Sequence, residues 1–148
     1  MLIDMKAIHD SRRTLVMGVL NITEDSFSDG GLWLEPAAAK AHGEAMMGDG
    51  ADIIDIGAES TRPGAKRVSE ADEKARVLGA VDSLIPEGAV LSIDTTRASV
   101  ASAALEHGAQ IINDVSGGRL DHELPHVVAD HSESLYIVQY WRGWLAGA

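Results

Sequence analysis

Four apolar runs in this chain each end in side chains that could bind a polar ligand. The first run leads into residues 21–31, which are dense in side-chain oxygens and close with two glycines. The second leads into residues 57–64, where the hydroxyls of Ser60 and Thr61 precede a guanidinium and a Pro-Gly turn. Oxygen-rich segments of this kind can hold a metal ion or a diphosphate. The planar guanidinium of Arg62 also matches the oxygens of a phosphate.

The third and fourth runs end in Asp94 and Asn113. A carboxylate and an amide suit an aminopyrimidine-like ring, because the carboxylate accepts from ring N–H groups and the amide bonds to a ring carbonyl. The alternatives are a solvated loop at residues 21–31, a surface turn at residues 57–64, and helix capping by Asp94 and Asn113. Polar groups at the ends of four consecutive apolar runs favour ligand binding, since each costs free energy unless it is paired.

The elements that must position these residues alternate along the chain. The candidate strands are Leu15–Leu20, Ile53–Gly57, Val90–Asp94, Ile111–Val115 and Leu135–Tyr140. They are apolar almost without interruption, which is typical of parallel strands covered on both faces. The candidate helices between them are Pro36–Met47, Ser69–Leu84, Arg97–Glu106 and His122–Ala129. We expect Ser69 to cap its helix at Asp72.

This alternation predicts an α/β fold with a parallel sheet. An open doubly wound sheet and a (β/α)₈ barrel both fit, although a complete barrel takes about 250 residues and the chain has 148. The connections after the first two strands are long and polar, whereas the helix-to-strand turns are short. We therefore expect function at the carboxyl ends of the strands, which bind ligands in both layouts.

Composition narrows the possible functions. The chain reads as one domain, residues 1–148, with a formal charge of −11 at pH 7 and no cysteine. The acidic balance argues against nucleic acid and anionic membranes as partners. The missing thiols exclude disulfides and thiolate chemistry. The apolar runs are far shorter than the roughly 20 residues of a membrane span, and no signal peptide is predicted, so we expect a cytoplasmic protein.

One short segment matches the sequence pattern of a metal site. Residues 122–126 match the H-E-x-x-H pattern of zinc proteases. We expect Asp121 to cap the following helix, which would place Pro125 in the first turn and the two histidines at a helix end. No third ligand follows at a suitable spacing, so a zinc peptidase is disfavoured. The chain also lacks the glycine-rich phosphate loops of nucleotide and dinucleotide enzymes.

Four segments together closely resemble dihydropteroate synthase, the folate-pathway transferase that sulfonamides inhibit. They are MGVLNITEDSFSDGG at residues 17–31, GAESTRPG at 57–64, SIDT at 92–95 and NDVSGG at 113–118. The resemblance implies a (β/α)₈ barrel of the TIM type, here only its first four strand–helix units and a fifth strand. It also implies an enzyme that joins 4-aminobenzoate to 6-hydroxymethyl-7,8-dihydropterin diphosphate and releases diphosphate with the help of Mg²⁺.

The resemblance assigns roles to individual residues. Asn21 matches the metal-binding asparagine, and Asp94 and Asn113 match the pair that binds the pterin. The other matches fall in two mobile loops, one of which encloses 4-aminobenzoate while the other lies near the diphosphate. The candidate catalytic residues are Asp25 and Arg62, and the candidate substrate-binding residues are Thr61, Asp94, Asn113, Ser26, Phe27, Ser60 and Pro63.

Two departures from the family qualify this prediction. The chain stops after its fifth strand, whereas later strands of the family supply an aspartate, a lysine and an Arg-x-His that bind substrates. The fifth strand of the family usually ends in Met-His, and here it reads Gln139-Tyr140. A half-barrel exposes apolar strand edges, so we expect a homodimer or other association through these edges. The alternatives are a truncated pterin-binding module without catalysis and a pterin-binding methyltransferase, although the latter has no use for residues 59–64.

Overall fold

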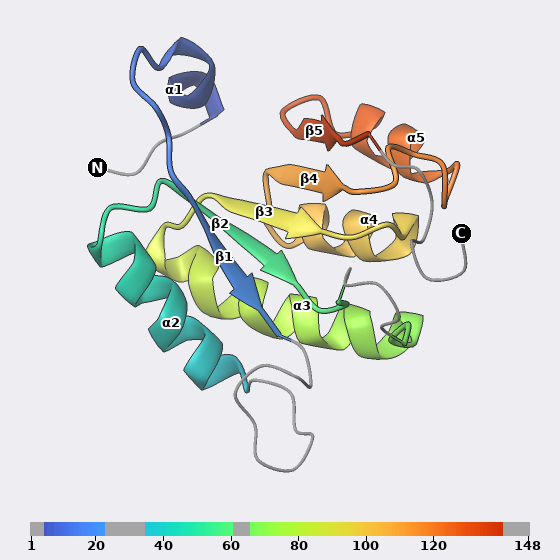
Figure 1. The fold of residues 1–148 in the computed structure, drawn as a ribbon, viewed down its shortest axis with the longest axis horizontal. Helices are drawn as coiled ribbons and strands as arrows, with labels where there is room; N and C mark the ends of the chain where they lie inside the picture. The colour runs from blue at the N-terminus through green and yellow to red at the C-terminus, as the bar shows by residue number, and fades with distance from the viewer. Residues whose placement is uncertain (1–4, 23–34, 61–65, 141–148) are drawn as a thin grey trace.

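The computed structural model describes residues 5–22, 35–60 and 66–140. Five parallel strands form one sheet in sequential order, with each strand beside the next in the chain (Figure 1). They are β1 (Met17–Asn21), β2 (Ile53–Gly57), β3 (Leu91–Asp94), β4 (Ile111–Asp114) and β5 (Leu135–Val138). The predicted parallel α/β architecture is confirmed, and each strand lies within about two residues of its predicted range.

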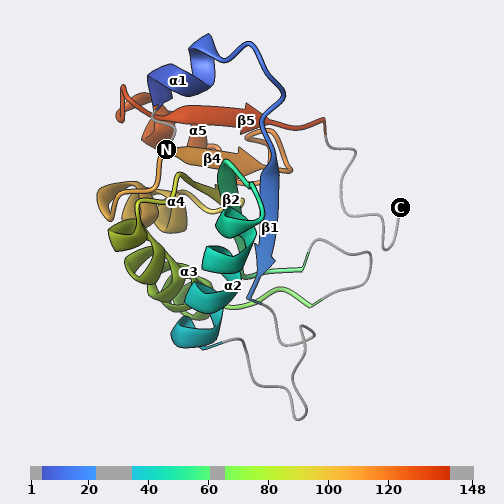
Figure 2. The ribbon, with the colours of Figure 1, turned by 90° about the vertical axis from the view of Figure 1, so that its left-hand side faces the viewer.

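Four helices form a layer on one face of this sheet, and each packs against the next (Figure 2). They are α2 (Pro36–Gly48), α3 (Glu70–Leu84), α4 (Ala98–Glu106) and α5 (Leu124–Ala129), with a short 3₁₀ turn η1 (Ile85–Glu87) after α3. Ser69 caps α3 as predicted, because its hydroxyl accepts a hydrogen bond from the Asp72 amide at 3.2 Å. A further short helix, α1 (Met5–Asp10), was not predicted and lies apart from this layer.

Alternation along the strands divides their side chains between two faces. Those that face the helices form the main core and are fully buried, as at Leu20, Ile56 and Ile93. The opposite face carries a smaller apolar cluster of Ile53, Val90 and Ile111, against which Ile8 of α1 packs. Both faces are therefore apolar near the amino ends of the strands, which explains the uninterrupted hydrophobic runs.

Each edge of the sheet exposes apolar side chains. Val19 on β1 is 56% exposed, and Val138 at the end of β5 is 60% exposed. Since β1 and β5 are the first and last strands in the sheet order, the described sheet is open at both edges. The expectation of exposed apolar edges is confirmed. In the part of the chain that the structure describes, no helix is long and apolar enough to span a membrane.

The start of α5 differs from its prediction. The helix begins at Leu124 with Glu123 in the N-cap position, not with Asp121. One oxygen of Asp121 accepts from the Glu123 amide at 3.1 Å, and the other accepts from the Ala98 amide of α4 at 2.8 Å. Asp121 therefore serves the first turn of a helix distant in sequence. His122 lies outside α5, and the described residues contain no group of three or more His, Cys, Asp or Glu side chains that could hold a metal ion.

The cap from Asp121 to α4 can be tested by mutation. Asp121→Ala leaves the Ala98 amide without its partner, so we expect the free energy of unfolding to fall by about 1 kcal/mol. Glu123→Ala is the matched control, because the Glu123 side chain makes no capping bond and its loss should cost under about 0.5 kcal/mol. Urea unfolding measures both variants, and equal losses would contradict the capping role of Asp121.

Candidate functional site

Four positions at the carboxyl ends of neighbouring strands lie in one row. Asn21 pairs with Gly57, Gly57 with Asp94, and Asp94 with Asn113. In a parallel sheet such register partners present their side chains on the same face. This face is the one opposite the helices, because Leu20, Ile56, Ile93 and Ile112 occupy the helix face. The structure thus places Asn21, Asp94 and Asn113 side by side on one face of the sheet.

Gly57 leaves space in the middle of this row. A Cβ atom at this position would lie 3.3 Å from Asp94 Oδ2 and 3.6 Å from Asn21 Oδ1. The missing side chain therefore opens a gap between an amide oxygen on β1 and a carboxylate on β3. A ligand group placed over Gly57 could contact both.

Asp94 has unusual electrostatics. It is half-buried, and within the described residues its carboxylate makes no hydrogen bond or ion pair. Burial raises the pKa of Asp94 to about 7, and the negative charges of Asp55, Glu73, Asp114 and Glu59 contribute in the same direction. A partly buried carboxyl group with a perturbed pKa and a free bonding capacity is typical of a ligand-binding position.

Asp55 lies two residues before Gly57 on the same face and was missed by the sequence analysis. It accepts a hydrogen bond from Ser92 Oγ at 2.7 Å, and the Asn113 amide nitrogen lies 3.5 Å from each of its carboxylate oxygens. Burial raises its pKa, while the bonds from Ser92 and Asn113 oppose that shift. The sequence does contain one clue to Asp55, which is a carboxylate inside the apolar run Ile53–Gly57. Such a carboxylate is expected to be buried, and a buried charge needs bonding partners.

Asn113 is held from its other side by Gln139, which follows β5. Gln139 Nε2 donates to Asn113 Oδ1 at 2.6 Å. Asn113 therefore bonds to residues on β2 and beyond β5 rather than to a helix, and the N-cap position of α4 is Arg97 rather than Asp94. The alternative that Asp94 and Asn113 are helix caps is wrong, since these side chains point away from the helix layer.

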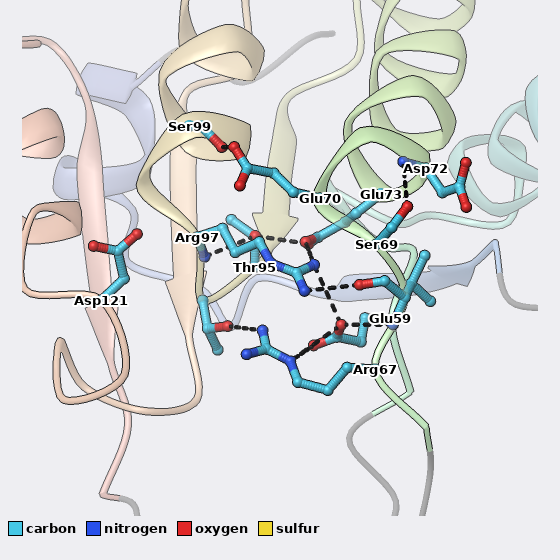
Figure 3. A network of polar contacts seen from close by, with 12 residues as sticks. Glu59, Arg67, Ser69, Glu70, Asp72, Glu73, Thr95, Arg97, Ser99 and Asp121 are labelled. Carbon is cyan, nitrogen blue, oxygen red and sulfur yellow. Dashed lines mark hydrogen bonds and ion pairs between the residues drawn. The ribbon is translucent and has the colours of Figure 1, made fainter.

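A network of charged side chains surrounds Glu59, just beyond β2 (Figure 3). The Glu59 carboxylate accepts from Arg67 Nε at 3.2 Å, from the Val68 amide at 3.0 Å and from Arg97 Nη1 at 3.3 Å. Because Arg67 and Val68 lie on the stretch that leads into α3, these bonds join the chain leaving β2 to the chain entering α3. Ser60 follows Glu59 directly and is half-buried.

Arg97 extends this network to the next helix and strand. Its Nη1 donates to Glu73 on α3 at 2.6 Å, and its Nη2 donates to the Val68 carbonyl at 2.7 Å. Thr95 Oγ1, just after β3, donates to the same Glu73 carboxylate at 2.7 Å. Burial raises the pKa of Glu73, whereas the bonds from Thr95 and Arg97 lower it. The sequence did not reveal this network, because its partners are separated by as many as 38 residues.

The fourth strand also ends in a carboxylate that the sequence analysis did not assign. Asp114 is fully buried on the helix face and accepts from the Ser116 and Gly118 amides at 2.9 and 2.8 Å. It accepts as well from the Tyr136 hydroxyl at 2.7 Å. These bonds fix the turn after β4, so Asp114 has a structural role. The remaining candidates, Asp25, Ser26, Phe27, Thr61, Arg62 and Pro63, lie outside the described residues.

Comparison with known proteins agrees with this arrangement. The sequence profile described as pterin binding enzyme matches residues 17–143, which cover the whole row. The chain belongs to the pterin-binding enzyme family. It is 50% identical over 127 residues to a dihydropteroate synthase of Mycobacterium leprae, a match that covers 86% of this chain and 44% of the relative.

Solved structures of dihydropteroate synthases share the fold. A Clostridium difficile structure determined in the presence of pteroic acid has a TM-score of 0.82 and 41% identity, over 89% of this chain and 51% of that one. A Xanthomonas albilineans structure with 4-aminobenzoic acid has the same TM-score and identity, over 89% and 48%. The chain thus spans about half the length of these proteins, and its open sheet corresponds to part of their TIM barrel.

The raised pKa of Asp94 predicts a pH-dependent effect of substitution. In the unfolded chain Asp94 ionises near pH 4, whereas in the folded protein it stays protonated up to about pH 7. Its ionisation therefore lowers stability as pH rises from about 4 to 7. We expect Asp94→Asn, which cannot ionise, to gain stability relative to wild type over this window, by about 1–2 kcal/mol at pH 8.

Urea unfolding at pH 5 and pH 8 tests this expectation. The control is Glu133→Gln, which makes the analogous carboxylate-to-amide change at an exposed position. An Asp94→Asn variant whose stability relative to wild type is the same at both pH values would contradict the raised pKa.

Proposed function

We propose that this chain supplies the pterin-binding half of a dihydropteroate synthase. The observation that carries this proposal is the row in which Asp94 and Asn113 lie side by side on the open face, next to the gap over Gly57. A carboxylate beside an amide complements the N–H donors and the carbonyl on the edge of a pterin ring. The relatives named dihydropteroate synthase support the same conclusion.

The reaction replaces a carbon–oxygen bond with a carbon–nitrogen bond. Diphosphate leaves the pterin methylene with the bonding electron pair, the aryl amine of 4-aminobenzoate attacks that carbon, and the amine loses a proton. Asp94 would anchor the ring through its N–H groups, and its ionised form would favour positive charge on the pterin as diphosphate departs. Arg62 would stabilise the negative charge of the leaving group. No covalent enzyme intermediate is needed, which agrees with the absence of cysteine.

Mg²⁺ is part of this proposal. The described residues offer the Asn21 amide oxygen, which lies on the same face as Asp94 and makes no hydrogen bond within the described part of the chain. Oxygen donors of this kind suit Mg²⁺, which keeps several waters and is commonly held by few protein ligands together with substrate phosphates. Bound there, the ion would neutralise charge on the departing diphosphate.

The open sheet bears on whether the chain acts alone. The exposed apolar side chains of Val19 and Val138 lie on opposite edges of the described sheet. We propose that these edges associate with further strands, from a second copy of this chain or from the remaining part of a barrel. A non-catalytic pterin-binding module is the second candidate function, because the chain spans only about half of its relatives. The cytoplasmic location stays a prediction.

A combined assay on the 148-residue chain separates these two functions. The chain is given pterin diphosphate, 4-aminobenzoate and Mg²⁺, with a full-length synthase as positive control, and it is titrated separately with 6-hydroxymethylpterin. Product formation would support synthase activity of this chain, because a binding module without catalysis forms no product. Binding without product would support the pterin-binding module. Absence of both would contradict the proposed site.

Two substitutions distinguish the parts of the proposed site. Asp94→Ala should weaken binding of both the free pterin and its diphosphate, because it removes the ring anchor. Arg62→Ala should weaken binding of the diphosphate form about tenfold or more while leaving the free pterin nearly unchanged, since a charged hydrogen bond to phosphate contributes about 1.5–3 kcal/mol. Calorimetric titration measures both ligands, with the exposed Arg12→Ala as control. Equal losses for both ligands in Arg62→Ala would remove that residue from the diphosphate site.

A further inference from the structure

The carboxylate of Glu59 joins the chain on either side of residues 61–65 (Figure 3). Glu59 follows β2 closely, and it accepts from the Val68 amide at 3.0 Å and from Arg67 Nε at 3.2 Å. Its side chain is only 9% exposed. These bonds connect the chain that leaves β2 to the chain that enters α3. Arg62 lies between the two connected positions in the sequence.

Arg97 ties the same two positions to a third part of the chain. Its Nη1 donates to Glu59 at 3.3 Å, and its Nη2 donates to the Val68 carbonyl at 2.7 Å. Glu73 on α3 accepts from Arg97 Nη1 at 2.6 Å and so holds the guanidinium in place. Arg97 lies in the short stretch between β3, which ends at Asp94, and α4. The network therefore fixes both positions beside the chain that follows Asp94.

This arrangement relates the two parts of the proposed ligand site. The ring anchor, Asp94, ends β3, whereas the proposed diphosphate ligand, Arg62, lies in the sequence between the positions that Glu59 connects. Because consecutive Cα atoms are about 3.8 Å apart, fixing both positions restricts where the residues between them can lie. A ligand that contacts Asp94 with its ring and Arg62 with its diphosphate then requires less ordering of the chain on binding.

We propose that Glu59 and Arg97 are positioning residues for diphosphate binding, because they hold both ends of the segment with Arg62 beside the chain that follows Asp94. The proposal rests on the function proposed above. The charge of Glu59 separates positioning from a general electrostatic effect. Glu59 is an anion near the proposed site of another anion, so by charge alone its removal should strengthen diphosphate binding. A positioning role has the opposite sign, since its loss weakens that binding.

The test compares binding of the pterin diphosphate with binding of free 6-hydroxymethylpterin, by calorimetric titration with Mg²⁺ present. Glu59→Ala removes the acceptor of Val68 and Arg67, so the diphosphate form should bind about three- to tenfold more weakly, because ordering of the segment then occurs on binding. Glu59→Gln keeps an acceptor for the Val68 amide and should show a smaller loss. Both variants should bind the free pterin nearly as well as the wild type. Unchanged or tighter binding of the diphosphate form to Glu59→Ala would overturn the proposal, and so would equal losses for both ligands.

Glu70→Gln is the matched control for the change of charge. Glu70 is the first residue of α3 and lies near the network, but it accepts from Ser99 of α4 (Figure 3). Its substitution removes the same charge and leaves the bonds of Glu59 in place. Binding of the diphosphate form should therefore not weaken in this variant. A loss as large as that of Glu59→Gln would overturn the proposal.

Arg97→Lys tests the second positioning residue at constant charge. A lysine ammonium lacks the planar fork of a guanidinium, so it cannot bond to Glu59, Glu73 and the Val68 carbonyl together. We expect the diphosphate form to bind about three- to tenfold more weakly and the free pterin to bind as in the wild type. Should Glu59→Ala fail to fold, this variant and Glu59→Gln carry the same prediction. Equal affinity of Arg97→Lys and wild type for the diphosphate form would contradict the role of Arg97.

Amide hydrogen exchange tests the network without a ligand. The Val68 amide donates to Glu59, so its exchange should be about tenfold or more faster in Glu59→Ala and unchanged in Glu70→Gln. Amides within β3 are the internal reference for global unfolding. Unchanged exchange at Val68 would overturn the proposal whether or not a ligand binds. Faster exchange, together with a wild-type chain that binds neither ligand, would confirm that Glu59 holds the two ends but contradict the proposed function, and with it the role in diphosphate binding.

Discussion

The crowding of carboxylates at the carboxyl edge of the sheet is the constraint on which the rest of this site depends. Asp55, Glu59, Glu73 and Asp114 all lie close enough to raise the pKa of Asp94. Buried negative charges of this density destabilise a fold unless each finds a partner. Most of the polar side chains and backbone amides around the strand ends supply such partners. Carboxylates that have these partners play a structural role, whereas the carboxylate of Asp94 is left available to a ligand.

The partners come from different sources. Arg97 bonds to both Glu59 and Glu73, which joins the chain after β2 to α3 and to the start of α4 (Figure 3). Asp114 is satisfied by backbone amides of its own turn and by Tyr136. Asp55 accepts from neutral donors on β3 and β4, namely Ser92 and Asn113. Asp94 alone among these five has no bonding partner in the described structure, and it is the one that faces the gap over Gly57.

The sheet that carries these carboxylates is covered by helices on one face only. Its helix face is closed by a continuous apolar core, whereas its other face has only a small cluster under α1 and then the polar row. In a closed barrel this second face is the interior, where ligand groups and side chains from other strands meet. The proposed binding function and the proposed association through β1 and β5 are therefore consequences of one geometry. The face that binds a ring is also the face that further strands would enclose.

The sequence by itself determined the elements and the identity of three residues in the row. Apolar runs and alanine-rich stretches located the strands and helices, and the motifs around Asn21, Asp94 and Asn113 marked the strand ends, because these signals are local in the chain. Only the tertiary structure decided that Asp55 lies beneath the row, that Asp121 caps α4, and that Gln139 holds Asn113. Each of these depends on strand register or helix packing, which bring together residues from 23 to 58 positions apart. Pairwise contacts over such separations leave no periodic or local pattern in a single sequence.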